Sequence, residues 1–199
     1  MRQIIFWAVL LVLLFFLYWI NWDLEPQNDL ARLQENYASE VEQICQEMQL
    51  PAPYFKALII LESSARKPAP SRFEPHVFAR LREVQTGSRP RYGRFTTSQL
   101  SLLSQDELKA MATSWGPLQV MGYHCIPMGL SISQLQGERG LWYAIQWADK
   151  SYGKWLRRGD FENAFHIHNT GQPLPQDGQP RTHDPHYIQK GLDWVKKLK

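Results

Sequence analysis

The sequence predicts a mainly α-helical chain, with one transmembrane helix at its N-terminus and a single helical domain after it. The first observation is an apolar run over residues 4–20 that contains no charged residue. The second is that, from Asp29 onward, apolar residues recur at threes and fours with polar residues between them, which is the spacing of α-helices. The third is that no internal repeat or low-complexity segment interrupts the pattern. The 199 residues suffice for one domain with a sizeable core plus a short extra segment.

Composition narrows the function classes only modestly. The formal net charge is +3, and no Lys/Arg-rich block of the nucleic-acid-binding type is present. We therefore expect no nucleic-acid partner. The two cysteines, Cys45 and Cys125, are too few for a disulfide framework. They would pair if the domain lies outside the cytoplasm, or would each be a small buried hydrophobe, and the second interpretation is favoured.

The apolar run at residues 4–20 is about long enough to span a bilayer, which takes roughly 17–25 residues. Aromatic residues typical of the membrane interface stand near both ends: Trp7, Tyr18, Trp19 and Trp22. Arg2 precedes the run and Asp23 follows it, so the positive-inside rule places the N-terminus in the cytoplasm. A cleaved signal peptide is the alternative, but no small-residue cleavage site follows. Residues 1–22 are predicted to be an uncleaved signal anchor of a bacterial inner-membrane protein, with the domain in the periplasm or facing the wall.

In the next segments, predicted helices alternate with breaks that contain proline. Residues 23–36 are predicted to be a linker and the start of a helix, and residues 37–199 the folded domain. Ser39 and Glu42 have capping-box spacing, so a helix could restart there. A second helix is expected to end soon after Glu62, before the prolines that follow. Residues 65–97 show little periodicity and are predicted to be a long irregular segment with short strands at most.

The second half is more regular. Residues 98–111 are predicted to be helical, with a second capping box at Ser104–Glu107. Pro117 is expected at the first position of a helix. Residues 138–158 form the clearest helical stripe, and Asp160 is expected to cap a short helix after it. A last helix is predicted from residue 184.

Glu62 is the first candidate for chemistry. Phe55, Leu58, Ile59 and Glu62 stand at i, i+3, i+4 and i+7, so they share one face of the helix. The apolar members indicate that this face points inward. A carboxyl group that loses water has a raised pKa, and a carboxylic acid that stays protonated near neutral pH can act as a general acid. The alternative is a Glu that reaches solvent at a fraying helix end.

Four short motifs carry a family resemblance. They are Glu62-Ser63, Phe73-Glu74-Pro75-His76, the segment Ser114-Trp115-Gly116-Pro117-Leu118-Gln119-Val120-Met121-Gly122, and His168-Asn169-Thr170-Gly171 with Tyr187 after it. Together they resemble the lysozyme-like muramidases and lytic transglycosylases, most closely the phage-endolysin-type N-acetylmuramidase domain. The resemblance implies a lysozyme-like, α-rich fold with a small β element. The chain departs from the family by His in place of Tyr at position 168 and by an inserted Thr.

The resemblance implies a peptidoglycan glycosidase, which cleaves the β-1,4 bond between N-acetylmuramic acid and N-acetylglucosamine. Glu62 would be the general acid. In an N-acetylmuramidase, Glu74 would be the candidate base, about 6.5–9.5 Å from Glu62 if the enzyme inverts configuration. In a lytic transglycosylase, Glu62 would act alone and the muramyl C6 hydroxyl would attack, giving a 1,6-anhydro product. Glu74 favours hydrolysis, although a local ion pair with Arg72 and His76 is the alternative for it.

The resemblance also implies a set of substrate-binding residues: Ser63, Trp115, Gln119, Met121, His168, Asn169 and Tyr187. The Gln119 amide would bond an acetamido group, Trp115 would stack on a sugar ring, and Tyr187 would donate a hydrogen bond near Glu62. Each of the three has a structural alternative. Gln119 would make a loop contact, Trp115 would be a packing anchor, and Tyr187 would be a core tyrosine. Asn169 would orient Glu62 or the sugar, and Ser63 is expected to bond locally.

Two further interpretations remain open. His166, His168, His183 and His186 have spacings that suggest a metal, but they match no fixed signature, so neither a metal nor a cofactor is expected. A membrane-tethered glycan-binding or assembly module without catalysis is the non-enzymatic alternative, and His168 is the feature that favours it. The expected partners are peptidoglycan glycan strands and, through residues 4–20, the inner membrane. The sequence predicts no particular protein partner.

Overall fold

The computed structural model describes residues 28–199. The predicted anchor at residues 4–20 lies outside these residues. Within residues 28–199, no helix combines the length and the apolar character needed to cross a membrane.

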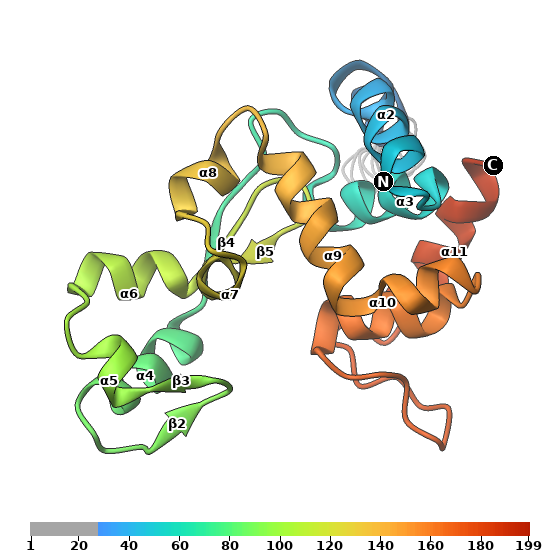
Figure 1. The fold of residues 1–199 in the computed structure, drawn as a ribbon. Coiled ribbons are helices and arrows are strands. Elements are labelled where there is room, and N and C mark those ends of the chain that lie inside the picture. Colours follow the sequence, from blue (N-terminus) through green and yellow to red (C-terminus); the bar gives the residue numbers. More distant parts are fainter. Residues whose placement is uncertain (1–27) are drawn as a thin grey trace, which may run out of the picture.

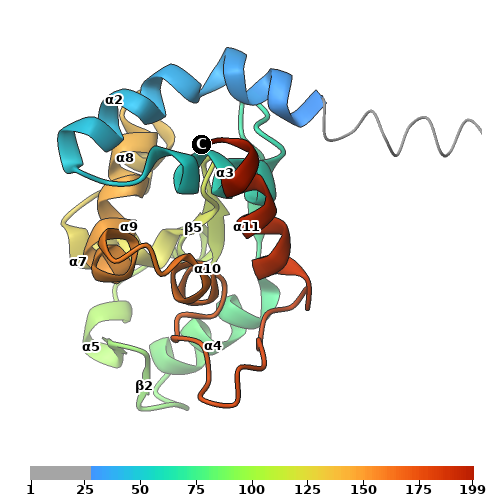
Figure 2. The same ribbon diagram turned by 90° about the vertical axis from the view of Figure 1, so that its right-hand side faces the viewer.

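The described chain is mainly helical and packs around two hydrophobic cores (Figure 1). The larger core joins a helical segment over residues 28–36 to five longer helices. These helices are α2 (Ala38–Met48), α3 (Ala52–Ser63), α9 (Gly140–Arg157), α10 (Phe161–Thr170) and α11 (Tyr187–Lys197). Figure 2 shows the segment 28–36 and α2 following one another across the top of the molecule, with α3 below them. The predicted α-rich fold with a small β element is confirmed.

The smaller core belongs to a separate lobe, on the left of Figure 1. Its elements are α4 (Pro75–Gln85), β2 (Arg91–Tyr92), β3 (Phe95–Thr96), α5 (Thr97–Leu100) and α6 (Gln105–Met111). The strands β2 and β3 form a two-stranded hairpin. The lobe therefore carries its own small sheet, apart from the helices of the larger core.

A three-stranded antiparallel sheet and three short helices connect the two lobes. The sheet has the order β1 (Arg72–Phe73), β4 (Thr113–Trp115), β5 (Val120–Met121). The short helices are η1 (Gly122–His124), α7 (Cys125–Met128) and α8 (Ile132–Gln136). Ser114 in the central strand stands opposite Arg72 on one side and Met121 on the other.

Helix α3 is the central element because almost all of its surface is covered. Its sequence is apolar nearly all round, which is the pattern of a helix buried among other elements. It packs along α11 and against α2. Ser64 and Ala65 then take left-handed backbone conformations, with φ of 50° and 51°, and end the helix directly after Glu62 and Ser63. The predicted helix end is confirmed.

Several sequence predictions need correction. The capping box at Ser39 does not form, because the helix restarts at Ala38 after a break at Tyr37, without a side-chain cap. Residues 98–111 form two helices, α5 and α6, and the predicted capping box at Ser104 starts the second one. The predicted helices over residues 138–158 and after Asp160 are confirmed.

Two local predictions were wrong. The segment 65–97 contains α4, whose buried Val77, Leu81 and Val84 stand at i, i+4 and i+7. Pro117 does not start a helix, because residues 116–119 form the turn that joins β4 to β5. Glycine at position 116 suits the left-handed φ of 73° in this turn.

The two cysteines are buried and unpaired, as the favoured interpretation expected. Cys45 lies in α2, and Cys125 begins α7. Burial raises the pKa of the Cys45 thiol to about 12 and that of Cys125 to about 11. Both thiols therefore stay protonated and act as small hydrophobic groups.

Candidate active site

Glu62 is the penultimate residue of α3, and its side chain is only 18% exposed. Burial raises the pKa of its carboxyl group to about 7. A hydrogen bond from Tyr187 and the positive charge of Arg72 act in the opposite direction but do not cancel the effect of burial. Glu62 is therefore substantially protonated at neutral pH, as a general acid must be.

Tyr187 reaches Glu62 from the first turn of α11. Its buried hydroxyl donates a hydrogen bond to Oε1 of Glu62. Burial, together with the nearby carboxylate, holds the pKa of the Tyr187 phenol well above its usual value. Tyr187 therefore remains a hydrogen-bond donor, and this bond brings together residues 125 positions apart in the chain.

His168 of α10 is the second polar group beside Glu62. Its Nε2 lies 3.7 Å from Oε1 of Glu62 and 3.1 Å from the carbonyl oxygen of Leu118. Its Nδ1 lies 2.8 Å from the hydroxyl of Tyr152. Burial lowers the pKa of His168 to about 4, so the imidazole is neutral at neutral pH.

These contacts assign the tautomer of His168. The carbonyl of Leu118 can only accept a hydrogen bond, so Nε2 carries the hydrogen. Nδ1 then accepts a hydrogen bond from Tyr152. Because Nε2 already carries a hydrogen, it cannot take a proton from Glu62. His168 is thus a neutral group that links α9, α10 and the turn between β4 and β5.

Glu74 is held by basic neighbours. Its Oε1 lies 2.9 Å from Nε of Arg72, and its Oε2 lies 3.6 Å from Nδ1 of His76. The Glu74 carboxylate is 19% exposed and stands directly before α4. The charge of Arg72 also lowers the pKa of Glu62, so Arg72 acts electrostatically on both carboxyl groups.

The side-chain amide of Gln119 forms hydrogen bonds to other groups of the protein. Its Nε2 donates to the carbonyl oxygens of Pro70, at 2.6 Å, and of Gly116, at 2.8 Å. Its Oε1 accepts from the hydroxyl of Ser114 at 2.9 Å. These bonds close the β4–β5 turn and fasten it to the loop before β1. They match the alternative in which Gln119 makes a loop contact.

The other predicted binding residues are scattered. Trp115 is partly buried, and its Nε1 donates to the carbonyl of Ala110 at 3.0 Å. Met121 packs against the smaller core. Ser63 is buried and donates to the carbonyl of Ile59 at 2.9 Å, whereas Asn169 is exposed on α10. Of the predicted site residues, the structure places Tyr187 and His168 directly beside Glu62.

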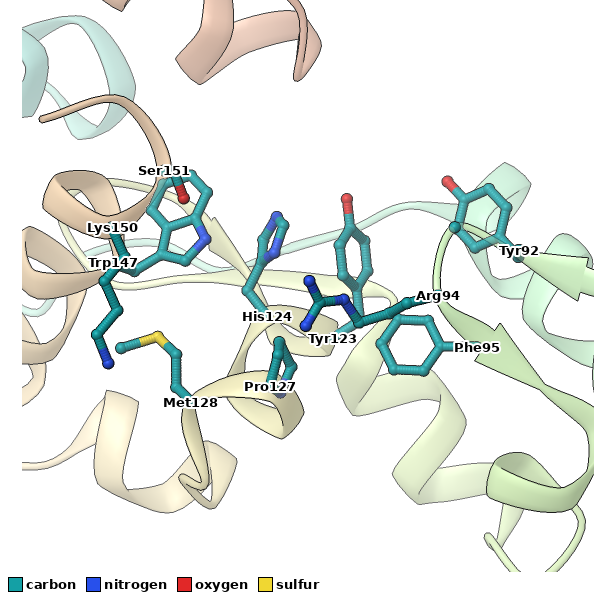
Figure 3. Close-up of a pocket in the computed structure, with 11 residues that line it drawn as sticks. Tyr92, Arg94, Phe95, Tyr123, His124, Pro127, Met128, Trp147, Lys150 and Ser151 are labelled. Atoms are coloured by element: carbon teal, nitrogen blue, oxygen red, sulfur yellow. The ribbon is translucent and has the colours of Figure 1, made fainter. Parts of the chain in front are cut away.

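A cavity of about 610 Å³ lies between the β2–β3 hairpin and α9 (Figure 3), and neither Glu62 nor Tyr187 nor His168 lines it. Trp147 of α9 and His124 of η1 form part of its wall, with ring centroids 4.7 Å apart. The Trp147 ring is also 5.6 Å from the ring of His168, centroid to centroid. His168 therefore lies beside both Glu62 and a wall residue of the cavity.

Sequence reasoning did not select Trp147, His124 or Tyr152 as site residues. Tyr152 was identified only as part of the apolar stripe of the helix over residues 138–158. Its contact with His168 depends on the packing of α9 against α10. No local sequence signal marks His124 or Trp147, because their shared wall forms only when α9 and η1 come together.

Two of the histidines considered for a metal site, His166 and His168, make hydrogen bonds within the protein. Within residues 28–199, no cluster of three or more His, Cys, Asp or Glu side chains could hold a metal ion. His166 is buried, with Nδ1 at 2.6 Å from the carbonyl oxygen of Gln172. Its Nε2 accepts from the backbone N–H of Arg181 at 3.1 Å. His166 therefore fixes the loop between α10 and α11.

Comparison with known proteins supports the fold. No protein-family profile matches the chain, and no curated protein matches it in sequence. Among solved structures, the fold is similar to that of a Burkholderia AP3 phage endolysin, with a TM-score of 0.55. The alignment covers 81% of this chain and 70% of the endolysin, at 15% sequence identity. The chain thus has a fold similar to that of this phage endolysin.

Proposed function

We propose that this protein is a peptidoglycan glycosidase that cleaves the β-1,4 bond between N-acetylmuramic acid and N-acetylglucosamine, with Glu62 as the general acid. The observation that carries the proposal is the buried Glu62 carboxyl, whose pKa is raised to about 7 and which accepts a hydrogen bond from Tyr187. The likeness of the fold to a phage endolysin and the motifs around Glu62 and Ser114 support the same substrate class.

The surroundings of Glu62 suit proton donation from one particular oxygen. Tyr187 donates to Oε1, and Nε2 of His168, which also faces Oε1, carries a hydrogen. The acidic proton of Glu62 therefore resides on Oε2, where it can pass to the glycosidic oxygen. As the bond breaks, the carboxylate that forms at Glu62 keeps the Tyr187 hydrogen bond, which stabilises its charge.

The second step has two routes, and the environment of Glu74 bears on the choice. A general base must have a carboxylate oxygen free to take a proton from water. Glu74 is paired with both Arg72 and His76. This arrangement favours the route without a second carboxylate, in which the muramyl C6 hydroxyl attacks and Glu62 serves first as acid and then as base.

The test is a digest of purified peptidoglycan by the full-length chain in a non-ionic detergent, with products identified by mass spectrometry. We expect anhydro-muramyl products, lost in Glu62→Gln and retained in Glu74→Gln. Reducing-end muramic acid products, lost in both variants, would instead establish an N-acetylmuramidase with Glu74 as base. Glu83→Gln, which alters an exposed ion pair on α4, is the matched control.

A glycan-binding module without catalysis is the second candidate, because His168 stands where the resembling family has Tyr. The neutral imidazole is fully occupied by Leu118 and Tyr152 and offers no further acceptor. If folded wild-type protein yields no products but binds glycan strands in a pull-down, this second function replaces the first.

A further inference from the structure

We propose that the cavity between the β2–β3 hairpin and α9 binds the carboxylate-bearing peptide arm of the muramic acid residue. This inference rests on the proposed function and adds a recognition site to it. It assigns to the cavity a ligand that differs from the sugar rings themselves. The two residues that would hold the carboxylates are Arg94 and Lys150.

The cavity combines aromatic walls with two cations. Tyr92, Tyr123 and Trp147 supply much of the apolar surface. Figure 3 shows Arg94 and Lys150 on opposite sides, one from the β2–β3 turn and the other from α9. At about 610 Å³, the cavity falls within the range of about 300–1,000 Å³ that is usual for small-ligand sites. It is therefore large enough for a peptide segment rather than a single ion.

The charge of this cavity is unbalanced. No Asp or Glu lines it. Among residues 28–199, neither Arg94 nor Lys150 takes part in an ion pair. Asp149, the acidic neighbour of Lys150 in sequence, is paired with Arg157 at 2.6 Å. The wall residue His124 is neutral near pH 7, because burial, His168 and Arg94 lower its pKa to about 4.

The position of the cavity selects the ligand. His168 lies beside both Glu62 and Trp147, a wall residue of the cavity, so on the proposed function a glycan strand held at Glu62 would bring its neighbouring groups to the cavity. N-acetylglucosamine is neutral and gives two cations nothing to pair with. The muramic acid residue carries carboxylates, either on its peptide arm or on its own lactyl group once the peptide has been removed. The aromatic lining and the size of the cavity favour the peptide arm.

The experiment separates these carboxylate sources by measuring binding. Full-length Glu62→Gln protein in non-ionic detergent is titrated with three soluble probes. These are glycan fragments with the peptide arm, the same fragments stripped by an amidase, and chitin oligosaccharides, which lack carboxylates. Because Glu62→Gln does not consume the probes, binding is measured whether or not the wild-type protein is an enzyme.

Each probe is tested with Arg94→Gln, Lys150→Gln and the double substitution added. Arg91→Gln, on the same hairpin, and Lys154→Gln, one turn further along α9, are the matched controls because both are exposed cations outside the cavity. We expect each cavity substitution to weaken binding of peptide-bearing fragments about fivefold, and the controls to have little effect. Binding of chitin oligosaccharides should not change.

Three results would overturn the inference. One is equal weakening for all three probes, and another is no change for peptide-bearing fragments. The third is an effect confined to the stripped fragments, which would assign the cations to the lactyl carboxylate. None of these depends on cleavage. The proposed function fails separately, if the wild-type protein yields no products from peptidoglycan.

Discussion

At the scale of single residues, the feature that most needs explanation is a buried acid that accepts a hydrogen bond from Tyr187 and yet keeps a raised pKa. Donors stabilise a carboxylate and so lower its pKa, yet the pKa of Glu62 is raised to about 7 because burial outweighs both Tyr187 and Arg72. The balance leaves Glu62 able to give its proton and able to hold the resulting charge. Two substitutions test the two sides of this balance separately.

Tyr187→Phe removes the hydrogen bond that lowers the pKa of Glu62 while keeping the buried ring. The pKa should therefore rise further above 7. In a profile of kcat/KM against pH, the limb on which activity falls as Glu62 loses its proton should move to higher pH. A limb that stays in place, or moves to lower pH, would contradict the assignment of this limb to Glu62. The control is Tyr143→Phe, because Tyr143 is a half-buried tyrosine that packs against the same larger core.

Glu62→Gln should stabilise the fold at high pH. The folded-state pKa of about 7 exceeds the usual 4.5, so the folded protein binds the Glu62 proton more tightly than the unfolded chain does. The stability that this group contributes is present below pH 4.5 and is lost as the pH rises to about 7. At pH 8 the loss is about 3 kcal/mol, since one pKa unit corresponds to about 1.4 kcal/mol.

Glutamine has the same shape and no charge, so the variant should avoid this loss. Urea unfolding of wild type and Glu62→Gln should show a gap of about 3 kcal/mol at pH 8 that closes toward pH 4.5. A gap that is the same at both pH values would show that the carboxyl group of Glu62 is not buried in its charged form. The expected gain in stability with loss of activity is common for active-site residues.

At the scale of elements, the β4–β5 hairpin joins the two lobes and brings its turn to His168. Its turn is closed by Gln119, and directly after β5 the first residue of η1, Gly122, packs against the end of α6. A Cβ on Gly122 would lie 2.2 Å from the carbonyl oxygen of Ala110 and 3.1 Å from Cα of Met111. The backbone of α6 therefore leaves no room for a side chain at position 122.

Gly122→Ala should for this reason destabilise the protein by about 3 kcal/mol or more, because backbone must move to relieve the overlap. Chemical unfolding measures the change. Gly137→Ala is the control. A Cβ at position 137 would lie 3.3 Å from its nearest neighbour, the carbonyl oxygen of Ser133, and the φ of −78° suits any residue. If the two variants lose equal stability, close packing at Gly122 is not the reason for glycine there.

At the scale of the whole molecule, two separately packed cores flank the site. The larger core carries Glu62, Tyr187 and His168, and the lobe with the smaller core contributes Arg94 to the cavity. An arrangement of this kind places a ligand site where two lobes meet, which is where small-molecule sites often occur. The proposed anchor at residues 4–20 would keep this site close to the membrane and limit which glycan strands it reaches.

The anchor is tested by fractionation and topology. Full-length protein should stay with membranes after alkaline extraction, and alkaline phosphatase fused after Lys199 should be active, as an exported domain requires. Leu11→Arg together with Leu14→Arg should abolish both results, because each charge at the centre of a span costs about 2.5–3.5 kcal/mol. A soluble wild-type protein, or an inactive fusion, would contradict the anchor and its orientation.

Local patterns in the sequence were enough to predict the helical class, the helix that ends at Glu62, and the helices over residues 138–158 and after Asp160. They succeeded because each rests on contacts within a few residues, such as a repeating apolar face or a capping side chain. Helix α4 was missed although Val77, Leu81 and Val84 have helical spacing, because the surrounding Pro, Arg and Gly indicated an irregular loop. The turn at Pro117 was misassigned because the amide of Gln119 closes it through Gly116 and also fastens it to Pro70, far away in sequence.

The candidate site was also predictable from the sequence only in part. Glu62 could be identified from its place on a buried helical face, and Tyr187 and His168 only through the family resemblance. Only the tertiary structure decides that Tyr187 and His168 meet Glu62, that Glu74 is paired with Arg72, and that Arg94 and Lys150 face one cavity. These relations join segments tens of residues apart. Their geometry is set by how α3, α9, α10 and α11 pack, and no local spacing encodes it.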